Sequence, residues 1–187
     1  MFYQLLRPFC YLTIEGMNGK RFYDIILPII LMALTTLIIL HPNYNIKMLF
    51  EEKGFIEKIV SFIIGLPGFF IAALAAIATF NRDGIDEPIN SNGESPYISV
   101  KVVRDNGNEY TSKEIITRRV FLCMLFSFLT AQSFILIIGY NIFNSAEYLN
   151  SNLIITISMA CTFIFIFYQI IVTTFFGLYY LGDRIHH

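Results

Sequence analysis

Residues 81–119 read NRDGIDEPINSNGESPYISVKVVRDNGNEYTSKEIITRR and separate two strongly apolar halves of the chain. A helix needs roughly 20 apolar residues to cross a bilayer core about 30 Å thick. Asp24, at the start of the first apolar run, is the one charged residue inside the runs. The pattern predicts an all-α membrane protein with four transmembrane helices and a small polar insertion between helices 2 and 3. The four runs are Phe22–Leu40, Ile59–Phe80, Val120–Tyr140 and Leu153–Leu181.

The composition also indicates a membrane protein, and it argues against direct binding of nucleic acid. Hydrophobic residues make up 56% of the chain and charged residues 14%, whereas soluble domains carry about 25% charged residues. The net charge of −1 provides no electrostatic attraction to nucleic acid, so we expect no direct nucleic-acid binding. The three cysteines form no CxxC pair and are expected to be small apolar fillers.

The positive charges predict an orientation. Ten of the 13 Lys and Arg residues lie in the N-terminal arm, in residues 81–119 or in the tail, and the other three lie between the first two runs. The positive-inside rule therefore predicts that both termini and residues 81–119 are cytoplasmic. Residues 1–80 are expected to form an interfacial arm and helices 1 and 2. Residues 81–119 would form a linker, a β-hairpin and the start of helix 3, and residues 120–187 helices 3 and 4 with a short tail.

The polar stretch has a pattern of its own. Residues 97–103 alternate in β-favouring side chains, and Asn106-Gly107 is a strong hairpin-turn signal before a second short run. Thr111 and Glu114 match a capping box, which predicts that helix 3 begins near Ser112. A lone two-stranded hairpin is marginally stable in water, so we expect a copy or a partner protein beside it. The expected partner contacts are Tyr97, Val100, Lys101, Val103, Arg104 and Tyr110.

Two helix faces are candidates for packing or transport. A small-residue face in the second run, Gly65, Gly68, Ala72 and Ala76, allows close helix approach. We expect it to pack within one bundle, with a subunit interface as the alternative. A polar seam in the fourth run is expected to hydrogen-bond to other helices. The wall of a water-filled pore and a lipid-headgroup site are its alternatives. The seam comprises Ser158, Thr162, Gln169 and Thr173.

The sequence contains no recognisable catalytic chemistry. The runs hold no carboxylate–histidine pair, and no G-x-S-x-G, H-E-x-x-H or P-loop motif is present. We therefore expect no catalytic residue, no cofactor and no metal site, and not an enzyme.

The layout resembles KwaA, the membrane subunit of the bacterial Kiwa anti-phage defence systems. The resemblance covers the whole chain: four spans, Lys20-Arg21 ahead of the first, and the Tyr97–Glu114 segment before the third. It implies a homotetrameric sensor in the bacterial inner membrane that detects phage attack. It also implies a soluble, DNA-binding cytoplasmic partner.

Three functions follow as hypotheses. The first is a non-enzymatic sensor or scaffold that oligomerises among membrane lipids and docks a soluble effector through its hairpin. The second is a small oligomeric channel or membrane-permeabilising effector lined by the polar seam. The third is an accessory subunit of a larger complex.

Overall fold

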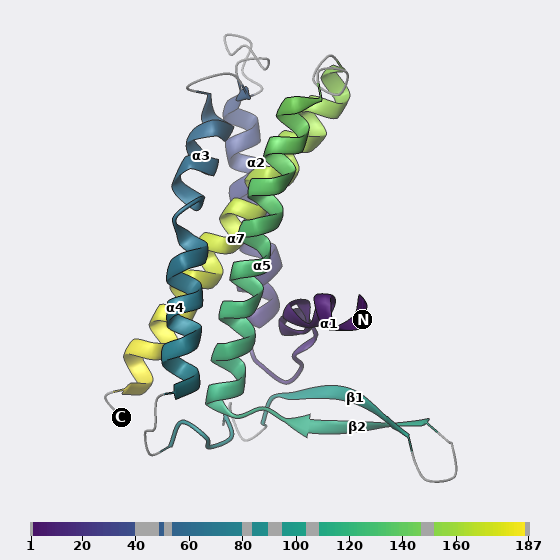
Figure 1. The fold of residues 1–187 in the computed structure, drawn as a ribbon, viewed down its shortest axis with the longest axis vertical. Helices are drawn as coiled ribbons and strands as arrows, with labels where there is room; N and C mark the ends of the chain where they lie inside the picture. Colours follow the sequence, from purple (N-terminus) through teal and green to yellow (C-terminus); the bar gives the residue numbers. More distant parts are fainter. Residues whose placement is uncertain are drawn as a thin grey trace.

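Long helices run side by side, and a small sheet crosses one end of them (Figure 1). The computed structural model describes residues 2–39, 49–50, 54–79, 84–89, 95–103, 109–146 and 152–185. We call the end that carries the sheet the hairpin end. The elements in chain order are α1 (Phe2–Leu6), the 3-10 helix η1 (Arg7–Thr13), the π-helix η2 (Phe22–Ile26), α2 (Leu27–Ile39), α3 (Phe55–Ile63), α4 (Leu66–Thr79), β1 (Tyr97–Val103), β2 (Glu109–Ile115), α5 (Arg118–Ser145) and α7 (Leu153–Ile185).

The four predicted long helices are confirmed. Four segments of the described chain are long and apolar enough to cross a membrane, which is compatible with a membrane location. Their bounds are Phe22–Ile39, Phe55–Thr79, Arg118–Ser145 and Leu153–Tyr180.

The second segment is interrupted where its sequence contains a proline. Ile64 and Gly65 form a turn between α3 and α4. Pro67 follows as the second residue of α4. Because proline has no backbone N–H, it cannot donate to the carbonyl of Ile63, and the hydrogen-bond ladder breaks there.

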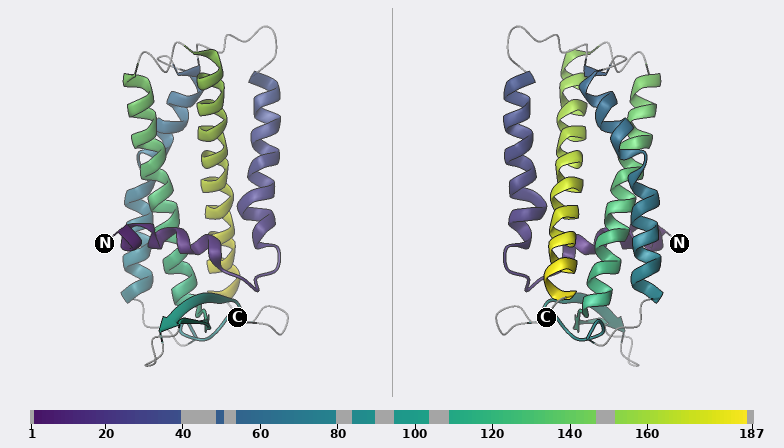
Figure 2. Two further views of the ribbon diagram at one scale, coloured as in Figure 1. Left: turned by 90° about the vertical axis from the view of Figure 1, so that its right-hand side faces the viewer. Right: turned by 90° about the vertical axis from the view of Figure 1, so that its left-hand side faces the viewer.

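Helix α5 forms the centre of the bundle. It packs against η1, α4 and α7, and Phe121, Leu125 and Leu129 on its inner face are fully buried. Helix α2 packs against α7 and stands at the edge of the bundle (Figure 2). Ile29 and Leu37 of α2 are exposed on this outer side, as expected of side chains that face lipid.

The predicted pairing of the two short strands is also confirmed. β1 and β2 are antiparallel, with a register that runs from Tyr97 opposite Ile115 to Val103 opposite Glu109. The expected Asn106-Gly107 turn lies outside the described residues. The strands extend sideways past the helices (Figure 1).

The predicted start of helix 3 is wrong. Thr111 lies inside β2, and α5 begins at Arg118 with Thr117 as N-cap. The Thr117 side chain accepts a hydrogen bond from Val120 N at 3.4 Å. A capping box stabilises a helix only where the following residues are helical. Here the pairing with β1 holds residues 109–115 extended, so α5 does not continue into the hairpin.

This correction predicts different effects for two threonines. Thr117→Ala should destabilise the protein by about 0.5–1 kcal/mol, the lower part of the usual N-cap range, because its hydrogen bond is long. Thr111→Ala is the matched control and should change stability by less, since Thr111 is an exposed strand residue. Thermal unfolding in mild detergent, followed by circular dichroism, measures both. A larger loss for Thr111→Ala would contradict the assignment of the cap.

Candidate functional site

A proline creates an unmet hydrogen-bond acceptor at the base of the first span. Pro28 has no N–H to donate to the carbonyl four residues earlier, that of Asp24. The turn before it is a π-helix, in which Leu27 N–H bonds to the carbonyl of Phe22. π-Helical turns are rare and frequently occur at functional sites. The Asp24 carbonyl therefore lacks the α-helical donor at position 28, and another part of the chain can supply one.

Two glutamines from other helices meet this need. Gln169 Nε2 of α7 donates to the Asp24 carbonyl at 2.7 Å. Gln132 Nε2 of α5 donates in turn to Gln169 Oε1. Because Gln169 must present its amide N–H₂ to the carbonyl, its oxygen faces Gln132. Hydrogen bonds thus join three of the four long segments in an apolar interior.

The side chain of Asp24 forms the second half of this buried polar cluster. Lys20 Nζ lies 2.6 Å from Asp24 Oδ2, and the Tyr11 hydroxyl donates to Asp24 Oδ1 at 3.0 Å. Lys20 also lies over the Tyr11 ring, 4.2 Å from its centroid. All three residues are buried. A buried ion pair repays its desolvation only when further hydrogen bonds satisfy the charges, and Tyr11 provides one.

Tyr11 belongs to the N-terminal arm and packs against aromatic side chains of α5. Its ring stacks on Phe128, with centroids 5.1 Å apart, and lies 6.0 Å from Phe121. Burial, and after it the neighbouring Asp24 carboxylate, raises the pKa of the Tyr11 hydroxyl. The hydroxyl therefore keeps its proton and remains a donor to Asp24.

Sequence reasoning identified only part of this cluster. The sequence singles out Gln169 and Gln132 as polar residues that need partners, because both lie in the middle of apolar runs. It gives no role to Tyr11 or to the pairing of Lys20 with Asp24. The spacing of four residues between Lys20 and Asp24 is an available signal, because such residues face each other on a helix. Nothing local to Tyr11 indicates its burial.

The four residues of the polar seam do not share one environment. Ser158 and Thr162 are exposed, and Thr162 Oγ1 donates back to the Ser158 carbonyl at 2.9 Å. Gln169 and Thr173 are buried inside the bundle. Gln132 Oε1 and Thr173 Oγ1 have no hydrogen-bond partner among the described residues.

The small-residue face, which comprises Gly65 of the turn and three residues of α4, is not packed against the bundle. Gly65, Gly68, Ala72 and Ala76 are all exposed. A Cβ added at Gly65 or Gly68 would meet no other described atom within 4 Å. The structure thus gives these residues no partner helix within the described part of the protomer.

The hairpin is tied to the N-terminal arm. Glu15 and Tyr97 exchange two backbone hydrogen bonds of 3.0 Å, and the Tyr97 hydroxyl donates to Glu15 Oε2 at 2.9 Å. Lys113 of β2 lies over the Tyr97 ring at 4.2 Å. Val100 is half-buried. Of the other predicted partner contacts, Lys101, Val103 and Tyr110 lie in the strands, and Arg104 lies outside the described residues.

Two arginines at the start of α5 bind the described part of the linker before the hairpin, residues 84–89. Arg119 pairs with both carboxylate oxygens of Asp86, at 2.7 and 2.9 Å. It also donates to the carbonyl of Ile77 at 3.0 Å, near the end of α4. The hydrogen bonds from Arg119 lower the pKa of Asp86, which keeps that carboxylate ionised. Arg118 donates to the carbonyl of Gly84 at 3.2 Å.

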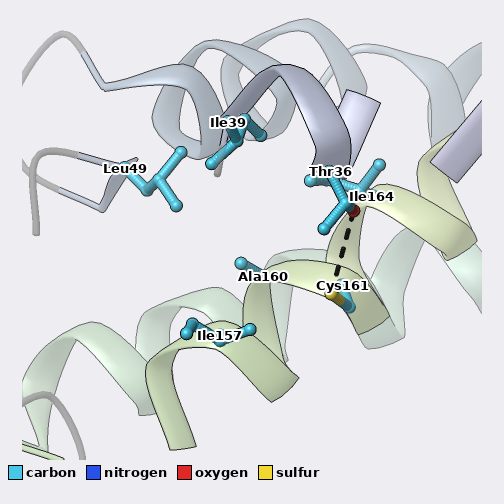
Figure 3. A pocket seen from close by; sticks show the side chains of 7 residues that line it. All are labelled: Thr36, Ile39, Leu49, Ile157, Ala160, Cys161 and Ile164. Carbon is cyan, nitrogen blue, oxygen red and sulfur yellow. Dashed lines mark hydrogen bonds between the residues drawn. The ribbon is translucent and has the colours of Figure 1, made fainter. Parts of the chain in front are cut away.

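Two cavities beside the helices are lined mainly by apolar side chains. Figure 3 shows a small pocket between α2 and α7, where Thr36 and Cys161 approach at 3.9 Å. Its space for a water-sized molecule is only about 10 Å³. A wider groove of about 340 Å³ runs between Tyr23 and Leu27 on one side and α7 on the other. In the described part of the chain, no three His, Cys, Asp or Glu side chains gather as a metal site would require.

Comparison with known proteins adds no assignment. No protein-family model, curated protein or solved structure matches this chain.

The link between Pro28 and Gln169 predicts an energetic coupling. Gln169→Leu should destabilise the protein by about 1–2 kcal/mol, because it leaves a buried carbonyl without a donor. In a Pro28→Ala background the same change should lower the free energy of unfolding by clearly less, because the introduced alanine supplies the missing N–H. A double-mutant cycle measured by unfolding in mixed micelles tests this. Equal costs in the two backgrounds would refute the coupling.

Proposed function

We propose that this protein is a non-enzymatic sensor or scaffold of the bacterial inner membrane that presents its hairpin to a soluble cytoplasmic partner. One observation carries the proposal: the base of the hairpin, where Tyr97 pairs with Ile115, is attached to two of the long apolar segments. Tyr97 at the start of β1 is bonded to Glu15, whose chain leads into the first span. Ile115 at the end of β2 is three residues from the start of α5.

These attachments make the hairpin a mechanical extension of the bundle. Pro88 and Thr117 form an isolated bridge. Ile116 N donates to the carbonyl of Pro96, and the Ile116 carbonyl accepts from Ile89 N. A displacement of the first or third span must therefore move the strands. A two-stranded sheet with this support need not be stabilised by a soluble domain.

The charges support a cytoplasmic position for the hairpin. Arg118 and Arg119 lie where α5 begins, and Lys20 and Arg21 lie where the first span begins. Positive charges close to the ends of spans have the strongest effect on orientation. The resemblance to the Kiwa membrane subunit rests on the four apolar runs, on Lys20-Arg21 and on the Tyr97–Glu114 segment. A role in anti-phage defence is therefore part of the proposal.

Self-association is part of the proposal as well. The exposed small-residue face of α4 is suited to close packing against a helix of another copy, because helices associate in lipid through such faces. A tetramer is the state that the Kiwa resemblance implies.

The channel hypothesis receives less support. Its four seam residues divide between an exposed pair, Ser158 and Thr162, and a buried pair, Gln169 and Thr173. A pore lined by all four would require α7 to rotate relative to its neighbours. That rotation would break the hydrogen bond from Gln169 to Asp24.

Charge reversal on the hairpin tests partner binding. In the variant Lys101→Glu with Arg104→Glu, we expect about tenfold less of the cytoplasmic partner to co-purify in mild detergent, because charged contacts across an interface are disrupted. Quantitative mass spectrometry of cross-linked membranes identifies the partner and measures its recovery.

A charge-matched variant provides the control. Lys53→Glu with Lys58→Glu changes the charge equally, near the start of the second long segment, and should leave partner recovery unchanged. Equal recovery with the hairpin variant and this control would rule out docking through the hairpin.

A further inference from the structure

The N-terminal arm lies at a defined depth beside the bundle. Tyr11 packs against Phe121 and Phe128, which follow Arg118 by three and ten residues. At 1.5 Å per residue these rings lie about 5 Å and about 15 Å along α5 from its start. Figure 2 shows the arm crossing the helices nearly at right angles, close to the hairpin end. If α5 crosses a bilayer, this is the level of the boundary between headgroups and acyl chains.

The two sides of the arm differ in what they contact. Tyr11 is fully buried and Ile14 is 6% exposed, so this side is part of the core. Leu5, Leu6 and Leu12 are 73%, 62% and 42% exposed. An amphipathic segment that lies in the membrane plane buries its apolar side in the upper acyl region. At this depth the solvent that covers the three leucines is lipid.

The arm contacts the hairpin through Glu15 and leads into the first long segment through a short link flanked by glycines. Gly16 and Gly19 have positive φ values of 82° and 78°, a conformation that glycine adopts without strain. Glu15, immediately before this link, carries the hydrogen bonds to Tyr97. A shift of the arm therefore acts on β1 through Glu15 and on the first long segment through the Tyr11–Asp24 hydrogen bond.

We propose that residues 2–13 are a lipid-reading element, whose leucine side inserts into the inner leaflet and whose Tyr11 side holds the arm to Asp24. The proposal rests on the proposed function in two respects, that the four long helices cross a membrane and that the hairpin end is cytoplasmic. It adds the class of ligand, the acyl and headgroup boundary of a lipid monolayer, and the residues that contact it. A leaflet with packing defects binds the leucines more strongly and moves the arm, and Glu15 carries this movement to the hairpin.

Tryptophan fluorescence tests the lipid contact directly, because the chain contains no tryptophan. Leu5→Trp is reconstituted in dioleoylphosphatidylcholine vesicles that contain lipid brominated near the headgroup or near the chain end. We expect the shallow bromines to quench this tryptophan several times more strongly than they quench Thr111→Trp on the exposed strand. Adding dioleoylglycerol, which opens packing defects, should increase the quenching further.

The position of the spans is tested in the same vesicles. Leu34→Trp, at an exposed position in the middle of the first span, should be quenched most by the deep bromines. Absence of that quenching would overturn the membrane architecture and with it the proposed function. Normal quenching of Leu34→Trp, with Leu5→Trp quenched no more than Thr111→Trp, would overturn only the proposal for the arm. Quenching of Leu5→Trp that does not change with dioleoylglycerol would also overturn it, because the arm would then be an anchor without sensitivity to packing.

Removal of one hydroxyl tests the attachment. Tyr11→Phe keeps the ring on Phe128 and removes the hydrogen bond to Asp24. We expect amide hydrogen exchange in lipid nanodiscs to become about 2- to 10-fold faster in residues 7–14, and also faster in β1. Tyr179→Phe, at an exposed tyrosine of α7, is the matched control and should change neither. Faster exchange in the arm with no change in β1 would refute the transmission to the hairpin.

Discussion

The carbonyl of Asp24 is the constraint on which the rest of the structure depends. Pro28 deprives it of its helical donor, and an apolar interior offers no water to replace that donor. Gln169 supplies the hydrogen bond, and its orientation then determines that of Gln132. Because these residues belong to the first, fourth and third long segments, the hydrogen bonds around this carbonyl join three helices.

The charged side chain of the same residue organises the hairpin end. Asp24 pairs with Lys20 and accepts the Tyr11 hydroxyl, and this holds the N-terminal arm against α5. The arm leads to Glu15, which is bonded to the first residue of β1. Asp24 thus contacts both the long helices and the N-terminal arm that leads to the hairpin. The same buried residue therefore connects the packing of the long helices to the position of the two-stranded sheet.

Several features were predictable because their signals are local. Long apolar runs and the alternation in residues 97–103 predict the helices and one strand. The helix start predicted from the Thr111–Glu114 capping pattern was wrong. A short polar motif is compatible with a strand as well as with a helix, and the pairing with β1 decided between them. The polar seam of α7 was predicted as one face, yet Ser158 and Thr162 lie outside the bundle while Gln169 and Thr173 lie inside. Helical periodicity shows which residues share one face of a helix. It does not show which part of that face other helices cover.

The sequence by itself determined which segments are long apolar helices, where the polar insertion lies and that residues 97–103 form a strand. These properties depend on run length and on spacing between near neighbours. Only the tertiary structure decided the partners of Asp24, the burial of Tyr11 and the exposure of the small-residue face. The physical reason is separation along the chain. Tyr11, Asp24, Gln132 and Gln169 come together only when four segments pack, and no local pattern records which polar groups will then face one another.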